Sequence, residues 1–357
     1  MIGIKALILS GGKGTRLRPI THTSAKQLVP VANKPILFYG LEAVREAGIR
    51  DVGIVVGDTA AEVKRAVGTG EEFGLRVEYI QQEAPLGLAH AVKIARDFIR
   101  NDPFVMYLGD NLLKNGITSF VEEFTRSESD AQILLAQVPN PSEFGVAEIQ
   151  NDRVVALEEK PKEPKSDFAL VGVYMFTSSI FEAVEKIKPS FRNELEITDA
   201  IQYLIDKDFV VNSHIVDGWW KDTGKLEDML DANRMILSEL SANLQSTPDE
   251  GSEIHGAVHL DPDVTVTGSV LRGPCIIGSG ARIVDSYIGP FTSIGAKSSV
   301  TGSEVENSII LEECTIRDIG SRIGSSLIGR QVTIERNRKP PQAYEFMVGE
   351  KSHIIIF

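Results

Sequence analysis

Cysteine is scarce in this sequence, with only Cys275 and Cys314 among 357 residues. The two lie far apart and match no metal-ligand spacing, and isolated thiols are typical of proteins in a reducing compartment. No apolar run approaches the ~20 residues that a membrane-spanning helix needs, and the first ten residues lack the small-residue cleavage site of a signal peptide. We therefore expect a cytoplasmic protein with two structural thiols and no membrane partner.

Positive charge is also in deficit. The chain has 37 lysines and arginines against 50 aspartates and glutamates, a formal net charge of -13. This balance argues against nucleic acid or an anionic membrane as a partner. It does not exclude a small anionic substrate, because a site can be locally basic or can use carboxylate-held Mg²⁺ to meet phosphate charge.

The first part of the chain alternates apolar strands with amphipathic helices. That alternation predicts a Rossmann-like α/β domain with a mostly parallel sheet, and ligands of such sheets bind outside the carboxyl ends of the strands. The expected strands are 5–10, 51–57, 76–82, 104–108, 131–138, 146–149, 154–157, 168–176 and 209–216. The expected helices are 35–47, 59–67, 88–100, 194–206 and 226–240.

The last third of the chain is an internal repeat. Branched apolar residues recur about every six positions, which indicates a parallel β-helix with three short strands per coil, expected to be left-handed. The recurring residues are Ile254, Leu260, Val266, Leu271, Ile277, Ile283, Ile288, Ile294, Val300, Val305, Leu311, Ile316, Ile323, Ile328 and Ile334. We expect a catalytic domain at 1–240, a polar linker at 241–252 and the β-helix at 253–357, with residues 353–357 covering an open end of the stack.

The histidines give little support for a metal or acyl-transfer centre. Of the six, only His255 and His259 are four residues apart. They fall in the repeat, which is not an α-helix, so this spacing does not indicate a zinc site. Hexapeptide β-helices also occur in acyltransferases with a histidine base, so acyl transfer stays a minor alternative for this pair. No Ser-His-Asp or Cys-His pair is apparent, which favours chemistry without a covalent intermediate.

The strongest local signal follows the first strand, where three glycines occur within four residues. Gly11, Gly12 and Gly14 leave backbone N–H groups free to approach phosphate oxygens. The segment is not a Walker loop, because Lys13 is followed by Gly14 rather than Ser or Thr. It is not a dinucleotide fingerprint either, because the pattern that starts at Gly12 ends in Leu17.

The segment continues to a second basic stretch, and the whole reads GGKGTRLRP followed by SAKQLVP. It resembles the signature of the sugar nucleotidyltransferases, and more narrowly that of glucose-1-phosphate thymidylyltransferases in the long form with a C-terminal β-helix. The resemblance continues in family order through Gly109-Asp110-Asn111, Glu158-Glu159-Lys160-Pro161, Glu194-Leu195-Glu196-Ile197-Thr198-Asp199 and Trp220-Lys221-Asp222-Thr223-Gly224.

The resemblance implies an in-line displacement at the α-phosphorus of a nucleoside triphosphate. Such a reaction needs positioning and charge neutralisation more than a protein nucleophile. Arg16 is expected to hold the leaving pyrophosphate, because its donors form a fork that suits a multi-oxygen anion. Lys26 is expected to offset charge near the α-phosphate. The implied nucleotide-binding residues are Leu9, Gly11, Gly12, Gly14, Thr15, Arg16, Gln82, Gly87 and Asp110.

Two aspartates are implied to hold Mg²⁺. Asp110 follows a buried strand and should project from its carboxyl end, and Asp222 is expected to lie comparably. Two carboxylates together with phosphate oxygens form a normal Mg²⁺ site. The alternative for Asp222 is a helix N-cap, since Thr223 and Gly224 follow it.

The remaining implied residues divide between the sugar phosphate and the base. Lys160 is expected to bind the phosphate of the sugar 1-phosphate together with Lys26, and Glu159, Gly145 and Val171 to line the sugar pocket. Gln82 and Gly87 match positions that read the pyrimidine edge. The chain has Phe144 where the short-form enzymes commonly have tyrosine, which puts one sugar-side or regulatory contact in doubt.

These expectations converge on an enzyme with small-molecule substrates. It would join dTTP to glucose 1-phosphate, giving dTDP-glucose and pyrophosphate with Mg²⁺ as cofactor. UTP or another sugar 1-phosphate is an alternative pair, and a non-catalytic regulatory or scaffold paralogue is an alternative of another class. The β-helix is expected to serve assembly, so we also expect a homo-oligomer.

Overall fold

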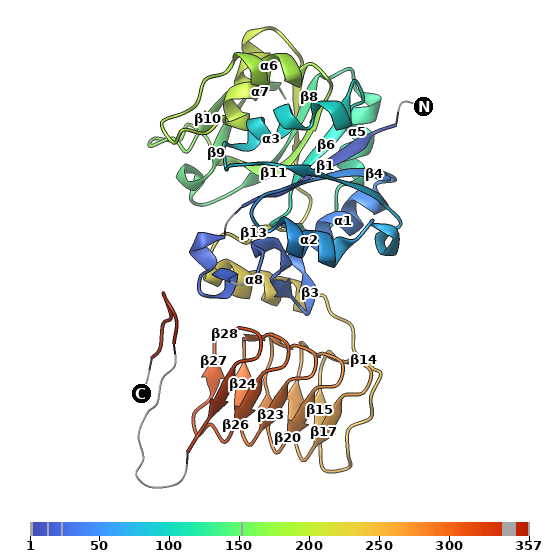
Figure 1. Ribbon diagram of the computed structural model, residues 1–357, viewed down its shortest axis with the longest axis vertical. Helices are drawn as coiled ribbons and strands as arrows, with labels where there is room; N and C mark the ends of the chain where they lie inside the picture. Colours follow the sequence, from blue (N-terminus) through green and yellow to red (C-terminus); the bar gives the residue numbers. More distant parts are fainter. Residues whose placement is uncertain (1–2, 13, 23, 151–152, 338–347, 356–357) are drawn as a thin grey trace. The chain divides into compact units, whose positions relative to one another are not determined.

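The computed structural model describes residues 3–12, 14–22, 24–150, 153–337 and 348–355, and the chain divides into two compact units (Figure 1). The first unit comprises Met1–Lys13, Ser24–Leu28 and Ile36–Asp222. The second comprises Gly14–Thr23, Val29–Pro35 and Thr223–Phe357. Packing therefore divides the chain differently from the expected boundaries at 240 and 252, because two N-terminal segments belong with the repeat. Within the described residues, no helix is both long and apolar enough to cross a membrane.

A nine-stranded sheet forms the centre of the first unit, in the order β5-β4-β1-β6-β11-β8-β12-β10-β9. In chain order its strands are β1 (Lys5–Ser10), β4 (Asp51–Val56), β5 (Arg76–Gln81), β6 (Phe104–Leu108), β8 (Ala131–Gln137), β9 (Gly145–Gln150), β10 (Arg153–Glu159), β11 (Phe168–Phe176) and β12 (Val211–Ile215). A separate two-stranded ribbon pairs β7 (Asn111–Leu113) with β13 (Trp220–Asp222).

The sheet is parallel throughout one half and mixed in the other, where only β8 and β12 run parallel. β1 runs parallel to β4 and β6, and β4 runs parallel to β5, as predicted. β11 runs antiparallel to both β6 and β8, so the expectation of a mostly parallel sheet is wrong for the other half. Strands β8 to β11 follow one another without an intervening α-helix, and short connections join antiparallel strands. The apolar pattern showed that these strands are buried but did not encode their direction.

Helices cover both faces of the sheet (Figure 1). Because side chains of a strand alternate between faces, Leu7 and Leu9 of β1 pack into one core and Ala6 and Ile8 into the other. The first core also takes α3 (Leu88–Ile94), α4 (Arg96–Ile99), α6 (Ile180–Lys186) and α7 (Ile197–Asp206). The second takes α1 (Ile36–Glu46), α2 (Ala60–Val67) and α5 (Thr118–Arg126). The helix predicted at 88–100 is thus divided at Ala95, and α5 and α6 were not predicted.

The second unit is built on three parallel sheets of short strands, an arrangement consistent with the predicted β-helix. One sheet contains β14 (Asn243–Leu244), β16 (Val258–Leu260), β19 (Cys275–Ile277), β22 (Thr292–Ile294), β25 (Ile309–Ile310) and β28 (Leu327–Ile328). The next contains β15 (Glu253–His255), β18 (Val270–Arg272), β21 (Tyr287–Ile288), β24 (Glu304–Glu306) and β27 (Ile323–Gly324). The third contains β17 (Thr265–Thr267), β20 (Arg282–Val284), β23 (Ser299–Thr301), β26 (Thr315–Arg317) and β29 (Thr333–Glu335).

Serines at one corner of the stack bind successive coils together. Ser286 donates its N–H to Ser269 Oγ at 3.0 Å, and Ser303 donates its N–H to Ser286 Oγ at 3.3 Å. Each step spans 17 residues rather than the eighteen that three hexapeptides would give. The irregular coil length shifts one member of the recurring series, because Ile294 pairs with Ile310 rather than with Leu311, and Ile310 lies in the apolar core.

Both ends of the repeat differ from expectation. The stretch predicted as a linker contains β14, which pairs in parallel with β16, so the stack begins inside it. At the other end, the side chains of Ile354 and Ile355 are 46% and 63% exposed. The described part of the C-terminal segment therefore does not cover an open end of the stack, and Ile356 and Phe357 lie outside the described residues.

The helix α8 (Leu226–Leu237) belongs to the second unit, and a buried asparagine links it to an N-terminal segment. The Oδ1 atom of Asn233 accepts hydrogen bonds from the Ala32 N–H at 2.9 Å and from Ser293 Oγ at 2.6 Å. Asn33 donates from its Nδ2 to the Ile294 carbonyl at 2.8 Å. The segment Val29–Pro35 is therefore held by both α8 and the β-helix.

Candidate functional site

Two of the residues predicted to bind the nucleotide, Gly11 and Gln82, lie side by side where β1 ends. Leu9 is nearly buried on β1, and Gly11 follows the strand. A Cβ added at Gly57 would lie 2.8 Å from the Gly11 carbonyl oxygen, so the backbones after β1 and β4 approach too closely for a side chain. A Cβ added at Gly11 would lie 3.2 Å from Gln82 Oε1, which places the Gln82 side chain beside the glycine turn.

Gly87 contacts Gln82, which agrees with the prediction that both residues read the same edge of the base. Gln82 donates from Nε2 to the Gly87 carbonyl at 3.3 Å. Gly87 has a φ of 101°, and an added Cβ would lie 2.3 Å from the Leu195 carbonyl oxygen. Only glycine fits this backbone conformation and this approach, so the turn before α3 is fixed in shape. Leu9, Gly11, Gln82 and Gly87 thus lie together at the carboxyl edge of the parallel strands.

The rest of the glycine segment divides between the two units. Gly12 belongs to the first unit. A Cβ added at Gly12 would lie 3.6 Å from Gln27 Nε2. Gly14 lies in the second unit with a φ of 61°, and starts the 3-10 turn η1 (Thr15–Leu17). Thr15 and Arg16 are exposed on this turn, above the buried Leu17. Their predicted contacts with the triphosphate stay predictions, and Lys13 lies outside the described residues.

An ion pair occupies the carboxyl end of β6. Lys26 is 7% exposed, and its Nζ donates to Asp110 Oδ2 at 2.5 Å. Asn111 donates from Nδ2 to the other carboxylate oxygen at 3.0 Å. Burial would raise the pKa of Asp110, but the charge and hydrogen bond of Lys26 outweigh it and hold the pKa below its ordinary value. Asp110 is therefore a carboxylate over the physiological range.

The second aspartate comes from the neighbouring ribbon. In the antiparallel pairing of β13 with β7, Asp222 lies opposite Asn111, the residue directly after Asp110. The pairing thus places Asp222 next to the segment that contains Asp110, although the two aspartates are more than a hundred residues apart in the chain. Among the described residues, no cluster of three or more acidic, histidine or cysteine side chains has metal-site geometry. A two-carboxylate centre fits Mg²⁺ best when phosphate oxygens and water complete the coordination shell.

Asn111 organises this centre and was not singled out from the sequence. It is 3% exposed, and its Oδ1 accepts hydrogen bonds from Trp220 Nε1 at 2.6 Å and from the Gly172 N–H at 3.3 Å. Its amide therefore joins β7, β11 and β13 while it binds Asp110. The segment Gly109-Asp110-Asn111 was quoted for the resemblance, but only the fold shows that its third residue positions the second.

The sugar-side residues meet where β9 and β10 pair. Gly145 lies opposite Glu159, and a Cβ added at Gly145 would lie 2.8 Å from Thr198 Cγ2 and 3.3 Å from Glu159 Oε2. Lys160 follows with a φ of 48°, and its N–H donates to the Phe144 carbonyl at 3.0 Å. The side chain of Lys160 is exposed, as expected for a phosphate ligand.

Arg192 holds Glu159 in place and was missed from the sequence. It donates to Glu159 Oε1 at 3.2 Å and to Glu196 Oε2 at 2.7 Å. Burial and then the Glu196 carboxylate raise the pKa of Glu159, although Arg192 and Lys160 oppose the shift. The only signal for Arg192 in the sequence was its position, two residues before the Glu194–Asp199 segment that carries the resemblance.

The side chains of Val171 and Phe144 both pack against other parts of the first unit. Val171 is fully buried in the second core, so its side chain packs inside the sheet and only its backbone can face a ligand. The pairing of β11 with β8 is interrupted between Leu170 and Tyr174, which frees the local backbone from regular geometry. The ring of Phe144 packs edge-on against Trp220, with centroids 5.4 Å apart, so it supports the ribbon that carries Asp222.

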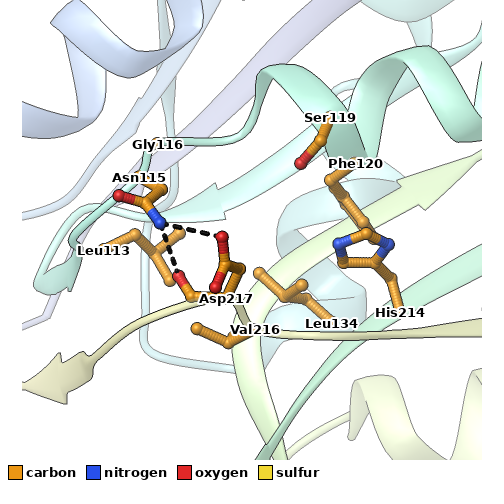
Figure 2. Close-up of a pocket in the computed structure, with 9 residues that line it drawn as sticks. All are labelled: Leu113, Asn115, Gly116, Ser119, Phe120, Leu134, His214, Val216 and Asp217. Carbon is orange, nitrogen blue, oxygen red and sulfur yellow. Dashed lines mark hydrogen bonds between the residues drawn. The ribbon is translucent and has the colours of Figure 1, made fainter.

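A small pocket lies elsewhere in the first unit and contains none of the predicted site residues (Figure 2). Asn115 donates from Nδ2 to both the carbonyl and the carboxylate of Asp217 at 3.1 Å, which ties the two sides of the pocket together. The lining residues are Leu113, Asn115, Gly116, Ser119, Phe120, Leu134, His214, Val216 and Asp217. The candidate site is therefore the group of predicted residues at the strand ends and not this pocket. We call this group the strand-end cluster; it comprises Leu9, Gly11, Lys26, Gln82, Gly87, Asp110 and Asp222.

Comparison with known proteins agrees with this geometry. The family model of the nucleotidyl transferases matches residues 5–239. The chain belongs to the nucleotidyl transferase family. It is 55% identical over 355 residues to the glucose-1-phosphate thymidylyltransferase of Streptomyces antibioticus, with 99% of each chain covered. It is 53% identical over 350 residues to the enzyme of that name in Streptomyces griseus, with 98% of each chain covered.

A solved structure supports the same conclusion. About two thirds of the chain resembles a Bacillus anthracis crystal structure described as "a Putative Glucose-1-Phosphate Thymidylyltransferase" in complex with a sucrose. The TM-score is 0.62 at 38% sequence identity, with 65% of this chain and 95% of the other covered. The prediction of a nucleotidyltransferase enzyme is thus confirmed. The near-complete coverage of the Streptomyces relatives shows that their similarity to this nucleotidyl transferase extends through the repeat.

Proposed function

We propose that this nucleotidyl transferase joins dTTP to glucose 1-phosphate, forming dTDP-glucose and pyrophosphate. The observation that supports the proposal is the strand-end cluster, in which Lys26 binds Asp110 and Asp222 pairs with Asn111, the residue after Asp110. The Streptomyces relatives that match nearly the whole chain bear the name of this reaction. A non-catalytic paralogue would be free to lose these charged residues, and the chain retains all of them.

In the proposed reaction, an oxygen of the sugar phosphate attacks the α-phosphorus, and the bond to the β,γ-pyrophosphate breaks in line with it. Gly11 and Gly12 give the triphosphate close access to backbone N–H groups, and Arg16 binds the departing pyrophosphate. Lys26, whose Nζ binds Asp110, offsets charge near the α-phosphate. Glu159 accepts hydrogen bonds from sugar hydroxyls while Lys160 binds the sugar phosphate.

Asp110 and Asp222 would hold Mg²⁺, which neutralises phosphate charge in the transition state when bound. The hard carboxylate oxygens of both residues and the lowered pKa of Asp110 support this assignment. The finer features of the proposal are a left-handed stack, assembly of several copies through its flat sides, and a cytoplasmic location. Three parallel sheets, the regular side faces and two buried thiols without a disulfide are compatible with these features.

The test is a matrix of substrates. Pyrophosphate release is measured with dTTP, UTP, dCTP and ATP against glucose 1-phosphate, galactose 1-phosphate and N-acetylglucosamine 1-phosphate. We expect the highest kcat/KM for dTTP with glucose 1-phosphate. A preference for UTP or for another sugar phosphate would keep the enzyme class and overturn the substrate assignment, and release with no pair would overturn the function.

We expect Lys160→Ala and Arg16→Ala to affect different substrates, because the two cations are assigned to different phosphates. Lys160→Ala should raise KM for glucose 1-phosphate by roughly ten- to a hundredfold, the size of one lost charge-assisted hydrogen bond. Arg16→Ala should lower kcat/KM for the nucleotide instead. Steady-state kinetics with each substrate varied in turn measures this split. Equal losses on both substrates in both variants would contradict the division.

A further inference from the structure

The amide of Gln82 is oriented by two neighbours. Its Nε2 lies 3.3 Å from the Gly87 carbonyl and 3.1 Å from His90 Nδ1. A backbone carbonyl can only accept, so the NH₂ end of the amide must face Gly87. His90 Nδ1 must then accept the other N–H, which places the proton of the neutral imidazole on Nε2. The opposite end, Gln82 Oε1, lies beside Gly11.

This orientation determines what Gln82 offers to a base. Both of its N–H groups are engaged by the protein, so the group left for a ligand is the Oε1 acceptor. Thymine and uracil carry a hydrogen at N3 and can donate to such an acceptor. Cytosine presents an unprotonated N3, whose lone pair would face the oxygen. An acceptor fixed in the site therefore discriminates by leaving the wrong base without its hydrogen bond.

We infer that His90 is a positioning residue that fixes the Gln82 amide so that the site accepts pyrimidines with N3–H and rejects cytosine. This inference rests on the proposed function, because it assumes that Gln82 reads the base of the nucleotide. His90 does not touch the substrate itself. Its action is to hold one N–H of Gln82 and so prevent the amide from turning over.

The helix that carries His90 is suited to this role. Gly87 precedes α3 in a conformation that leaves no room for a side chain, and Ala89 and Ala91 on either side of His90 are buried in the core. His90 itself is half-buried and points to Gln82. Burial and then the charge of Lys93 lower the pKa of His90, which favours the neutral ring that an acceptor at Nδ1 requires.

The experiment compares His90→Ala, His90→Asn and the control Asp97→Asn, an exposed position on the following helix α4, in the full chain. kcat and KM are measured with dTTP, UTP, dCTP and CTP at saturating glucose 1-phosphate. We expect His90→Ala to raise KM for dTTP about tenfold and to reduce the preference for dTTP over dCTP by about tenfold, the scale of one hydrogen bond. kcat should change little.

His90→Asn provides the rescue, because its side-chain oxygen can replace Nδ1 as acceptor and should restore most of the preference. Asp97→Asn should leave the preference unchanged. An unchanged dTTP-to-dCTP ratio in His90→Ala would overturn the inference, as would an equal loss for every nucleotide. A wild type that prefers UTP would overturn the thymidylyl assignment alone, since UTP against CTP then tests His90. A wild type that prefers CTP or ATP would overturn both.

Discussion

Replacing Asp110 or Asp222 with asparagine should lower kcat by at least about a hundredfold, the scale expected for loss of one preorganised electrostatic group. Asparagine keeps the size of the side chain and one oxygen but removes the charge that would hold Mg²⁺. Asp110 follows β6, and Asp222 lies opposite Asn111 on the paired ribbon, so each should supply one ligand to the same centre. Pyrophosphate release is measured over a Mg²⁺ titration after treatment with EDTA.

The matched control is Asp97→Asn, an exposed aspartate on α4. It should retain the wild-type rate, and thermal melting should show that all three variants fold. EDTA should abolish the activity of the wild type, and added Mg²⁺ should restore it. Near-normal rates for Asp110→Asn or Asp222→Asn at limiting Mg²⁺ would refute the metal assignment, whatever the substrate pair.

Ending the chain at Gln245 should cost at least about tenfold in kcat/KM for the nucleotide, and not only assembly. Every catalytic residue assigned from the sequence precedes the repeat, which predicts that truncation costs oligomerisation or long-term stability before it costs chemistry. The structure changes that expectation, because Gly14–Thr23 and Val29–Pro35 belong to the unit of the β-helix. Truncation removes the Ile294 carbonyl that binds Asn33 and the Ser293 hydroxyl that binds Asn233. The segment that carries Thr15 and Arg16 would lose a contact as well, because Ile20 Cδ1 lies 3.4 Å from the position of a Cβ at Gly329.

Circular dichroism and light scattering establish whether the shortened chain folds and how it assembles, and pyrophosphate release reports its activity. If it aggregates, Asn33→Gly in the full chain tests the same link, because glycine suits the φ of 60° at this position and removes only the side-chain hydrogen bond. A milder loss in kcat/KM is expected there. A folded truncated chain with wild-type kinetics would show that the repeat serves assembly alone.

Strand ends were predictable because they depend on local composition. The apolar run of β1 stops at glycines, and the run of β6 stops at Gly109, so Asp110 could be placed at a carboxyl edge without coordinates. Strand direction was not predictable in the same way, since β11 is as apolar as a parallel strand but runs antiparallel to both neighbours. Burial leaves a mark on residue type, and direction depends on how connections close.

Residues that position other site residues could not be predicted from the sequence, for a related reason. Asn111, Arg192 and His90 each contact a predicted site residue, but polar side chains of these types are common on surfaces and carry no distinguishing pattern. Their roles follow from distances of about 3 Å to partners that lie up to 109 residues away. Such contacts exist only after the sheet and ribbon have formed.

The sequence by itself determined the alternation of strands and helices, the repeat, and the residue types able to bind phosphates, because each depends on local pattern and chemistry. Tertiary structure alone decided that Lys26 pairs with Asp110, that Asp222 reaches the same ribbon as Asn111, and that Val171 turns its side chain into the core. It also decided that the N-terminal loop segments pack with the repeat. These outcomes depend on which distant surfaces bury one another, and a linear pattern contains no record of that pairing.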